Sequence, residues 1–279
     1  MDFAADIRYV DTMWPVWTFG WWSVAVAVLG AIVGSFLNVV IVRLPRGESI
    51  VIPRSHCVFC RHPLAWWENI PIVSFLFLHG QCRHCERRIS WRYPTVEVLT
   101  ALLSLLLWWR YEALLPYTVY FFFLIAPLIA LSFIDLEHLI IPDVLSLTGI
   151  ATGLVSRLVL SGYGDRWEGF FNGVVGVLVG GGLLFVVAWG YERLKHQEGL
   201  GGGDVKLAAM LGAFFGWRAS LFILLVSSVL GSVVGLLFLV ALKKGLKHPI
   251  PFGPFLSLAG LAYLFIGPEL IHWYLKLFH

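Results

Sequence analysis

Residues 199–217 read GLGGGDVKLAAMLGAFFGW, in which a run of glycines leads into an aspartate and then into an apolar segment. Apolar runs also lie before and after this stretch, so Asp204 stands among segments that look membrane-embedded. Ionisable residues in such segments are costly and tend to be functional. Glycine reaches backbone conformations closed to other residues and lets another segment approach closely. We therefore expect residues 201–203 to form a hinge that brings Asp204 against a second segment.

The composition is that of a multi-pass membrane protein. Of the 279 residues, 59% are hydrophobic and only 13% are charged, whereas a soluble domain carries about 25% charged residues. The net charge of +3 is too small to indicate binding of nucleic acid. The expected partner is therefore the lipid bilayer, with no nucleic acid.

Apolar runs bounded by charges or by Pro and Gly predict an all-α polytopic fold with about eight transmembrane helices. A span needs about 20 residues to cross the hydrocarbon core. The sixth run is shorter, so it is either tilted or only partly embedded. The expected spans lie near residues 17–42, 94–109, 115–134, 142–160, 168–192, 204–217, 219–242 and 253–275.

The basic residues orient this bundle. If the polar segment 43–93 is cytoplasmic, that side carries 14 of the 20 Lys and Arg residues, and cytoplasmic loops are enriched in these residues. This arrangement places residues 1–16 outside. The expected organisation is an extracytoplasmic N-terminus at 1–16, a first transmembrane helix at 17–42, a small cytoplasmic insert at 43–93 and a transmembrane bundle at 94–279.

All four cysteines lie in the insert, as two C-x2-C pairs separated by 21 residues: Cys57, Cys60, Cys82 and Cys85. Two such pairs fit a tetrahedral Zn²⁺ site. A segment of about fifty residues buries little core of its own, so a metal is a reasonable source of stability. Four thiolates leave no open coordination position, which predicts a structural zinc. Free or redox-active thiols remain the alternative.

A second acidic segment, LSFIDLEHLIIPD at 131–143, ends the third expected span and begins the fourth. The hinge is expected to bring Asp204 against Asp135. Two aspartates that share a site resist simultaneous ionisation, and one shared proton provides an acid and a base. This pair is equipped to activate water against a peptide bond. The first alternative has Asp204 as the charged base and Asp135 as the protonated acid. Because the two would titrate jointly, the sequence leaves open which is acid and which is base.

Simpler interpretations stand beside this one. Asp143 follows Pro142 at the start of a helix, where an acidic residue is ordinary, and Lys206 fits a positive-inside anchor. Acids at helix ends are often only solvated, and that reading stays open for Asp135 and Asp204. The glycines of the fifth span have G-x-x-x-G spacing and indicate close helix packing: Gly173, Gly176, Gly180, Gly181 and Gly182. The segment IPFGPF at 250–255 reads as a structural turn.

Taken together, these motifs resemble the type IV prepilin peptidases, which are membrane aspartyl enzymes with a G-x-G-D motif. The resemblance covers most of the chain. Its segments are GSFLNVVIVRLP at 34–45, PRSHCVFC at 53–60, WWENIPIVSFLFLHGQCRHC at 66–85, RYPTVE at 92–97, IDLEHLIIPD at 134–143, GGGDVKLAAMLGAFFG at 201–216 and IPFGPFLSLAG at 250–260. The resemblance implies that Asp135 and Asp204 are catalytic. It further implies that four residues support them: Gly201, Gly203, Asp143 and Lys206.

The resemblance also implies a substrate and a location. Such enzymes remove the leader of prepilins or pseudopilins, in type IV pilus or type II secretion systems, at the cytoplasmic face of the bacterial inner membrane. Many also methylate the new N-terminus with S-adenosylmethionine. No motif here locates the methyl-donor site, and the insert at 43–93 is where we expect it. Residues 94–279 would then form the peptidase bundle.

Two other functions stay open. A presenilin-type intramembrane protease also pairs aspartates near G-x-G-D, although the insert and the position of the acids at the membrane rim argue against it. A proton-coupled transporter would use the same aspartates as a relay, but the chain shows no repeated halves. The sequence indicates neither the particular pilins processed nor the oligomeric state.

Overall fold

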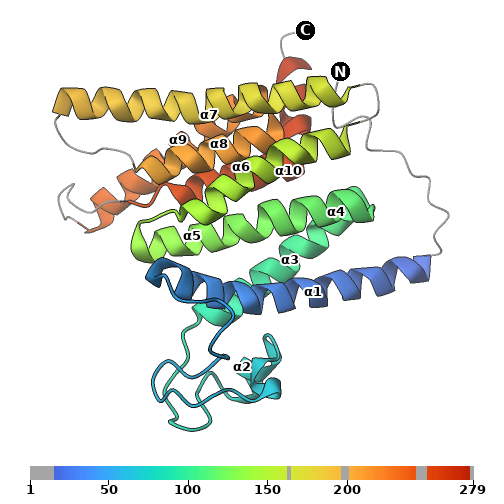
Figure 1. The fold of residues 1–279 in the computed structure, drawn as a ribbon, viewed down its shortest axis with the longest axis vertical. Helices are drawn as coiled ribbons and strands as arrows, with labels where there is room; N and C mark the ends of the chain where they lie inside the picture. The colour runs from blue at the N-terminus through green and yellow to red at the C-terminus, as the bar shows by residue number, and fades with distance from the viewer. Residues whose placement is uncertain (1–15, 162–164, 196–200, 243–249, 277–279) are drawn as a thin grey trace. The chain divides into compact units, whose positions relative to one another are not determined.

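The computed structural model describes residues 16–161, 165–195, 201–242 and 250–276. In these residues the chain is helical apart from turns and an irregular insert between α1 and α3 (Figure 1). Two isolated β-bridges, both in the insert, are the β pairings found there. The expected extracytoplasmic segment 1–16, except its last residue, lies outside the described residues. So do Lys243, Lys244 and Lys247, which contributed to the expected orientation.

A helix stands at each expected span, which confirms the all-helical membrane fold. The third span is one continuous run of α4 (Leu114–Tyr120), a π-helical turn (Phe121–Ile125) and α5 (Ala126–His138). The others are α1 (Val16–Arg43), α3 (Arg92–Tyr111), α6 (Asp143–Leu160), α7 (Arg166–Lys195), α8 (Gly202–Phe215), α9 (Trp217–Leu242) and α10 (Gly253–Lys276). Among the described residues, 5 helices are long and apolar enough to cross a membrane. The count of about eight spans stays a prediction.

The chain divides into two compact units. The described part of the first ends at residue 130, and the described part of the second begins at residue 131. In the first unit α1 and α3 pack closely, because glycines of α1 face α3. A Cβ atom on Gly34 would lie 2.7 Å from the Cα of Glu97. One turn further, the side-chain amide of Asn38 donates to the carbonyl oxygen of Tyr93 at 3.1 Å. These contacts fix the antiparallel register of the two helices.

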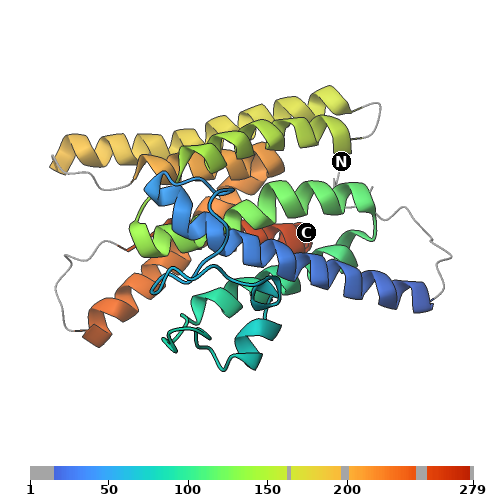
Figure 2. The same cartoon turned by 60° about the horizontal axis from the view of Figure 1, so that its bottom comes forward.

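The second unit is built around α8, which is enclosed by other helices. All residues from Leu207 to Phe214 are buried, and α8 contacts α6, α7, α9 and α10. Figure 1 shows α8 among these helices, and Figure 2 shows α6 and α7 side by side. A helix that is apolar on every face is one that the protein itself surrounds. With 14 residues, α8 is about 21 Å long, which accounts for the short sixth run in the sequence.

The closest helix approach in this unit joins α7 to α8. A Cβ atom on Gly176 would collide with the carbonyl group of Gly212, and one on Gly212 would collide with that of Gly176. A Cβ on Gly180 would lie 2.6 Å from the carbonyl oxygen of Ala208. The packing role predicted for the glycines of the fifth span is therefore confirmed for Gly176 and Gly180. It is wrong for Gly182, because nothing lies within 4 Å of its Cβ position.

This difference gives a matched pair of substitutions on one helix. Gly176→Ala should lower the free energy of unfolding by about 1–3 kcal/mol, because the added methyl group forces α7 and α8 apart. Gly182→Ala should leave stability unchanged or raise it by up to about 1 kcal/mol, since alanine is the better helix former. Thermal unfolding of the detergent-solubilised variants measures both. Equal stabilities would contradict the packing assigned to Gly176.

Candidate active site and candidate metal centre

Asp135 lies in the last turn of α5 and is buried, with 5% of its surface exposed. Its Oδ2 atom accepts a hydrogen bond of 2.9 Å from the backbone N–H of Gly253. Gly253 is the first residue of α10, so this N–H is one of the amides that a helix leaves free at its N-terminus. The positive end of the α10 dipole therefore faces the carboxyl group. A carboxylate at the unfavourable end of α5 thus gains a partner from another helix.

Asp204 lies in the first turn of α8 and is also buried, with 9% of its surface exposed. Its backbone N–H donates to the carbonyl oxygen of Gly201 at 3.1 Å. Its Oδ1 atom is buried and has no hydrogen-bond partner among the residues that the structure describes. A buried polar oxygen without a partner is costly and calls for a functional explanation. In this protein it offers an acceptor that a water or substrate group can use.

The side chain of Ile141 joins the two aspartates. A Cβ on Gly203, next to Asp204, would lie 2.7 Å from the Cβ of Ile141. A Cβ on Gly253, the residue that donates to Asp135, would lie 3.3 Å from the Cδ1 of the same isoleucine. The predicted juxtaposition of segments 131–143 and 199–217 is therefore present in the structure.

The glycines at 201–203 contribute to this juxtaposition by close packing and not by the flexibility expected of a hinge. None of residues 201–203 has a positive φ, so their backbone does not use the freedom special to glycine. Close approach is needed at Gly203 alone, against Ile141. Nothing lies within 4 Å of a Cβ on Gly202, and a Cβ on Gly201 would meet only the Asp204 side chain at ordinary contact distance.

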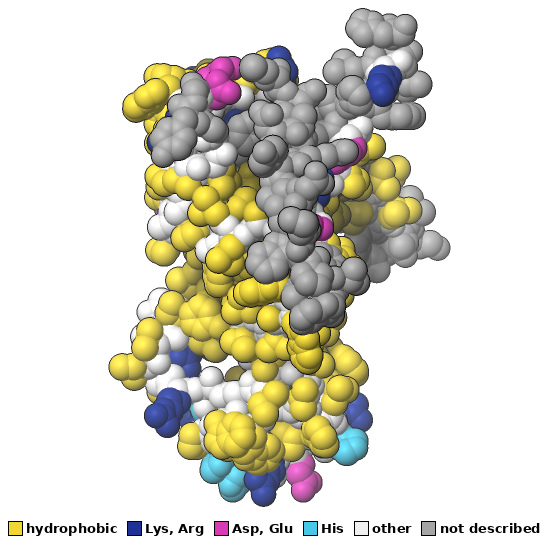
Figure 3. All heavy atoms as spheres, turned by 90° about the vertical axis from the view of Figure 1, so that its right-hand side faces the viewer, with side chains coloured by type: hydrophobic (Ala, Val, Ile, Leu, Met, Phe, Trp, Pro, Cys, Tyr) yellow, Lys and Arg dark blue, Asp and Glu magenta, His cyan; other side chains and the backbone are white. Residues whose placement is uncertain are grey.

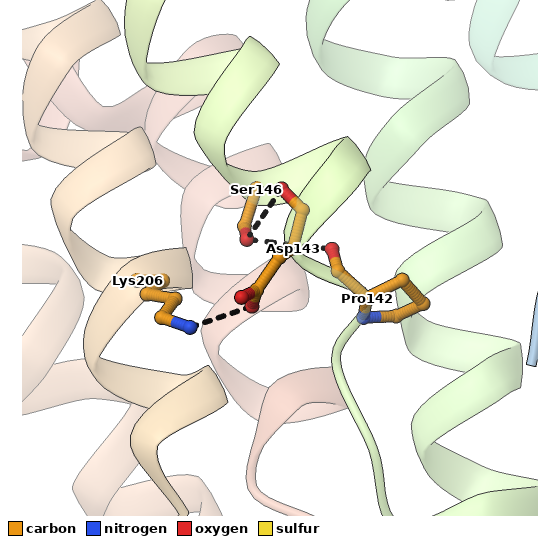
Figure 4. Close-up of polar contacts among 4 residues, drawn as sticks. All are labelled: Pro142, Asp143, Ser146 and Lys206. Carbon is orange, nitrogen blue, oxygen red and sulfur yellow. Dashed lines mark hydrogen bonds and ion pairs between the residues drawn. The ribbon is translucent and has the colours of Figure 1, made fainter.

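Asp143 and Lys206 form an ion pair, which the sequence interpretation missed. The Nζ atom of Lys206 lies 2.6 Å from Oδ1 of Asp143, and the side chains are 38% and 58% exposed (Figure 4). An exposed pair contributes little stability. It does connect the first turns of α6 and α8, because Asp143 begins α6 and Lys206 follows Asp204 by two residues. Both residues therefore lie beside the aspartate pair, with their charges matched to each other.

Gly253 is the site residue that sequence reasoning did not find. The segment IPFGPF was expected to be only a turn, yet its glycine supplies the hydrogen bond to Asp135. The backbone N–H of Phe255 donates to the Phe252 carbonyl at 3.1 Å, so α10 begins at this glycine. The available signal was a glycine at the start of a predicted helix, where free amides gather.

The four cysteines converge in the insert. The sulfur atoms of Cys57, Cys60, Cys82 and Cys85 all lie within 4.8 Å of one another. Two of the distances are 3.8 Å, from Cys57 to Cys85, and 4.0 Å, from Cys60 to Cys82. Tetrahedral Zn²⁺ with bonds of about 2.3 Å to sulfur separates its ligands by about 3.8 Å. The sulfurs are too far apart for disulfides, so the arrangement fits a metal ion.

The two cysteine pairs adopt the same local structure. Arg61 and Glu86, each following the second cysteine of its pair, both have φ of +56°. The N–H of Arg61 donates to the Cys57 carbonyl, and that of Glu86 donates to the Cys82 carbonyl, both at 2.9 Å. Each turn points its two sulfurs the same way, as a shared metal requires.

The thiols have uneven acidities. Backbone N–H groups of Cys85 and His84 lower the pKa of the Cys82 thiol to about 7. For Cys60, a backbone hydrogen bond at His62 lowers the pKa, but desolvation and hydrogen bonds with the other three cysteines outweigh it and raise the pKa to about 11. Thiols this close do not all ionise unaided. A bound cation would compensate four thiolate charges, since metal ligation requires the deprotonated form.

The class of polytopic helical membrane proteins with two buried aspartates at helix ends includes the membrane-embedded aspartyl proteases. Two family comparisons specify this class further. Residues 28–111 match the bacterial peptidase A24 N-terminal domain, and residues 122–236 match the type IV leader peptidase family. The chain belongs to the type IV leader peptidase family.

Similar proteins extend over most of the chain. A prepilin leader peptidase/N-methyltransferase of Aeromonas salmonicida strain A449 is 38% identical over 276 residues, covering 88% of this chain and 90% of that protein. One from Pseudomonas putida is 37% identical over 288 residues, covering 91% and 96%. One from Myxococcus xanthus strain DK1622 is 44% identical over 226 residues, covering 78% and 64%. No solved structure gives a significant match.

Gly203 and Gly202 provide a test of the contact with Ile141. Gly203→Ala should lower the rate of prepilin cleavage, the activity that the relatives' names state, by about 10²-fold, because an error of 1 Å in a reacting group costs that much. Gly202→Ala adds the same methyl group one residue earlier, where space is open, and should retain activity. Single-turnover cleavage rates of the purified variants decide. Equal rates would show that Ile141 does not fix the position of Asp204.

Proposed function

We propose that this protein is a membrane aspartyl endopeptidase that removes the leader peptide of prepilins or pseudopilins. The single observation that carries the proposal is that two buried aspartates, from α5 and α8, each lie beside a glycine that packs on Ile141. The names of the relatives support the reaction. No specific feature of the described residues favours a transporter or a presenilin-type protease.

Asp135 and Asp204 act as one catalytic unit that shares a proton. One carboxylate takes a proton from water, and the hydroxide so formed adds to the scissile carbonyl carbon. The other carboxyl group donates its proton to the carbonyl oxygen. As the tetrahedral intermediate collapses, the first carboxyl group passes the proton taken from water to the leaving amine, and the second regains its proton from the intermediate's hydroxyl group. The N–H of Gly253 holds Asp135 in place through this cycle. The side chain of Ile141 packs on both Gly203 and Gly253. The Oδ1 atom of Asp204, which has no partner among the described residues, can accept a hydrogen bond from the reacting water.

The positive-inside distribution of charge supports an active site at the cytoplasmic face of the bacterial inner membrane. The segment 43–93, which holds eight arginines and three glutamates, and Lys206 then share one side. The relatives' names also support N-methylation of the new N-terminus, with S-adenosylmethionine as the methyl donor. Whether the enzyme works for a type IV pilus or for a type II secretion system depends on which prepilin or pseudopilin it processes.

Zinc is the metal we propose for the insert, held by Cys57, Cys60, Cys82 and Cys85. Four sulfur ligands leave no coordination position for water, so the ion supplies a structural crosslink. The cysteine turns on either side of it hold the insert together.

Asparagine substitutions test the catalytic pair. Asp135→Asn and Asp204→Asn should each lower leader removal by about 10²- to 10⁴-fold, because loss of either proton-transferring group disables the pair. Asp143→Asn removes a neighbouring exposed carboxylate and should lose less than about tenfold. The assay combines purified protein, a prepilin and methyl-labelled S-adenosylmethionine. It scores leader loss and label transfer together.

Label transfer to a pilin already lacking its leader shows that each variant is folded. Full cleavage by Asp135→Asn or Asp204→Asn would remove that residue from the mechanism. Absence of both activities in the unmodified protein would refute the proposed function itself.

Replacement of cysteines tests the metal. The double variant Cys57→Ser, Cys60→Ser should lose its bound zinc and melt at a lower temperature than the unmodified protein, because two ligands of the crosslink are gone. His56→Ala is the control: His56 precedes the first cysteine, and its ring contacts the carbonyl oxygen of Arg54 at 3.1 Å. Elemental analysis measures the metal. Zinc retained in the serine variant, or lost in the histidine variant, would contradict the four-cysteine site.

A further inference from the structure

The short helix α2 (Val73–Phe77) in the insert leaves apolar side chains uncovered. Val73, Leu76 and Phe77 are 43%, 65% and 79% exposed. The lower end of Figure 3, where His side chains mark the insert, shows a broad hydrophobic surface with Lys and Arg beside it. Large apolar groups exposed together mark a surface that contacts another apolar phase.

The residue before α2 is fixed to a transmembrane helix pair. Ile72 has φ of +63°, a conformation that β-branched residues rarely adopt. Its backbone N–H donates to Oε2 of Glu97 in α3 at 2.7 Å. Glu97 is buried, so this bond forms away from water and holds the strained residue in place.

The register of α1 and α3 then gives the depth of α2. Glu97 lies against Gly34 of α1, and α1 is long and apolar enough to cross the membrane. Gly34 precedes Arg43, the last residue of α1, by nine positions, which is about 13 Å along the helix axis. The backbone of Glu97 therefore lies about this distance from the charged end of α1, and the Glu97 side chain holds Ile72 beside the apolar part of the helix pair.

The middle of α2 contacts a residue expected near the membrane surface. The ring of Phe75 packs on that of Trp91, with 5.1 Å between centroids. Trp91 precedes α3 directly and is 74% exposed, as expected of an interfacial tryptophan. Thus α2 is held by Glu97 of α3 at the residue before its start and by Trp91 at its middle. Its uncovered side chains stand at the depth where interfacial helices bury their apolar face, about 5–10 Å into the bilayer.

We propose that α2 is a membrane-inserted wedge, with Leu76 and Phe77 among the phospholipid acyl chains of the leaflet on the side of the insert. Charge supports the same partner, because the insert carries eight arginines against three glutamates and basic segments are attracted to anionic headgroups. The wedge seats the insert on the bilayer. It does not depend on the proposed peptidase activity.

Photo-crosslinking in proteoliposomes tests the wedge. The full chain, with Phe77 replaced by p-benzoylphenylalanine, is reconstituted into vesicles of phosphatidylethanolamine and phosphatidylglycerol and irradiated. Mass spectrometry should find phospholipid attached to the peptide that contains position 77. The same probe in place of Phe75, which faces Trp91 on the same helix, should give several-fold less lipid adduct and crosslink within the chain instead.

Three outcomes would overturn the proposal: no lipid adduct at position 77, equal adducts at 75 and 77, or crosslinks from 77 to a second copy or to added prepilin. A Phe77 variant that fails to retain its metal and helical content is replaced by the probe at Leu76, to which the same outcomes apply. Prepilin cleavage by the unmodified protein is measured in the same vesicles. Failure of the wedge and failure of the peptidase proposal are therefore distinguished.

Discussion

The backbone contact between Gly176 of α7 and Gly212 of α8 is the constraint on which the second unit depends. Within a bilayer no hydrophobic force draws two helices together, so association relies on packing at close range. Glycine at both positions lets the backbones of α7 and α8 approach to this close range. The contact encloses α8, and an enclosed α8 holds its first turn, with Asp204, away from lipid. Burial of Asp204, the carboxylate that we propose to be catalytic, thus begins with two residues that have no side chains.

The site itself is assembled from helix ends. The last turn of α5 and the first turns of α6, α8 and α10 meet around one isoleucine, Ile141. Each of the last three helices presents the positive end of its dipole there. The positive ends of three helix dipoles therefore stabilise negative charge on two acids that repel each other. It also explains why so much of the site consists of glycine and backbone amides: close approach leaves little room for side chains.

Features with a local cause were predictable from sequence. The helices follow from apolar runs, and the cysteine cluster follows from the spacing of two C-x2-C pairs. Asp135 and Asp204 could each be singled out locally, as an acid at the end of an apolar run. Features that depend on distant segments meeting were not. The bond from Gly253 to Asp135 links residues 118 positions apart, and the pair of Lys206 with Asp143 links residues 63 apart. The glycine run shows the same limit. The sequence suggested a flexible hinge, whereas the structure requires glycine only at position 203, where Ile141 lies too close for a side chain.

The paired cysteine turns have a consequence for the segment between them. Residues 61–81 form a loop whose two ends are held by the sulfurs, and α2 lies inside that loop. A crosslink around a loop of this size removes roughly 3 kcal/mol of chain entropy from the unfolded state. Release of the metal would return that freedom to the whole loop, including the strained residue that precedes α2. The metal and the lipid contact that we propose would therefore be thermodynamically linked, so that each should be tighter when the other is present.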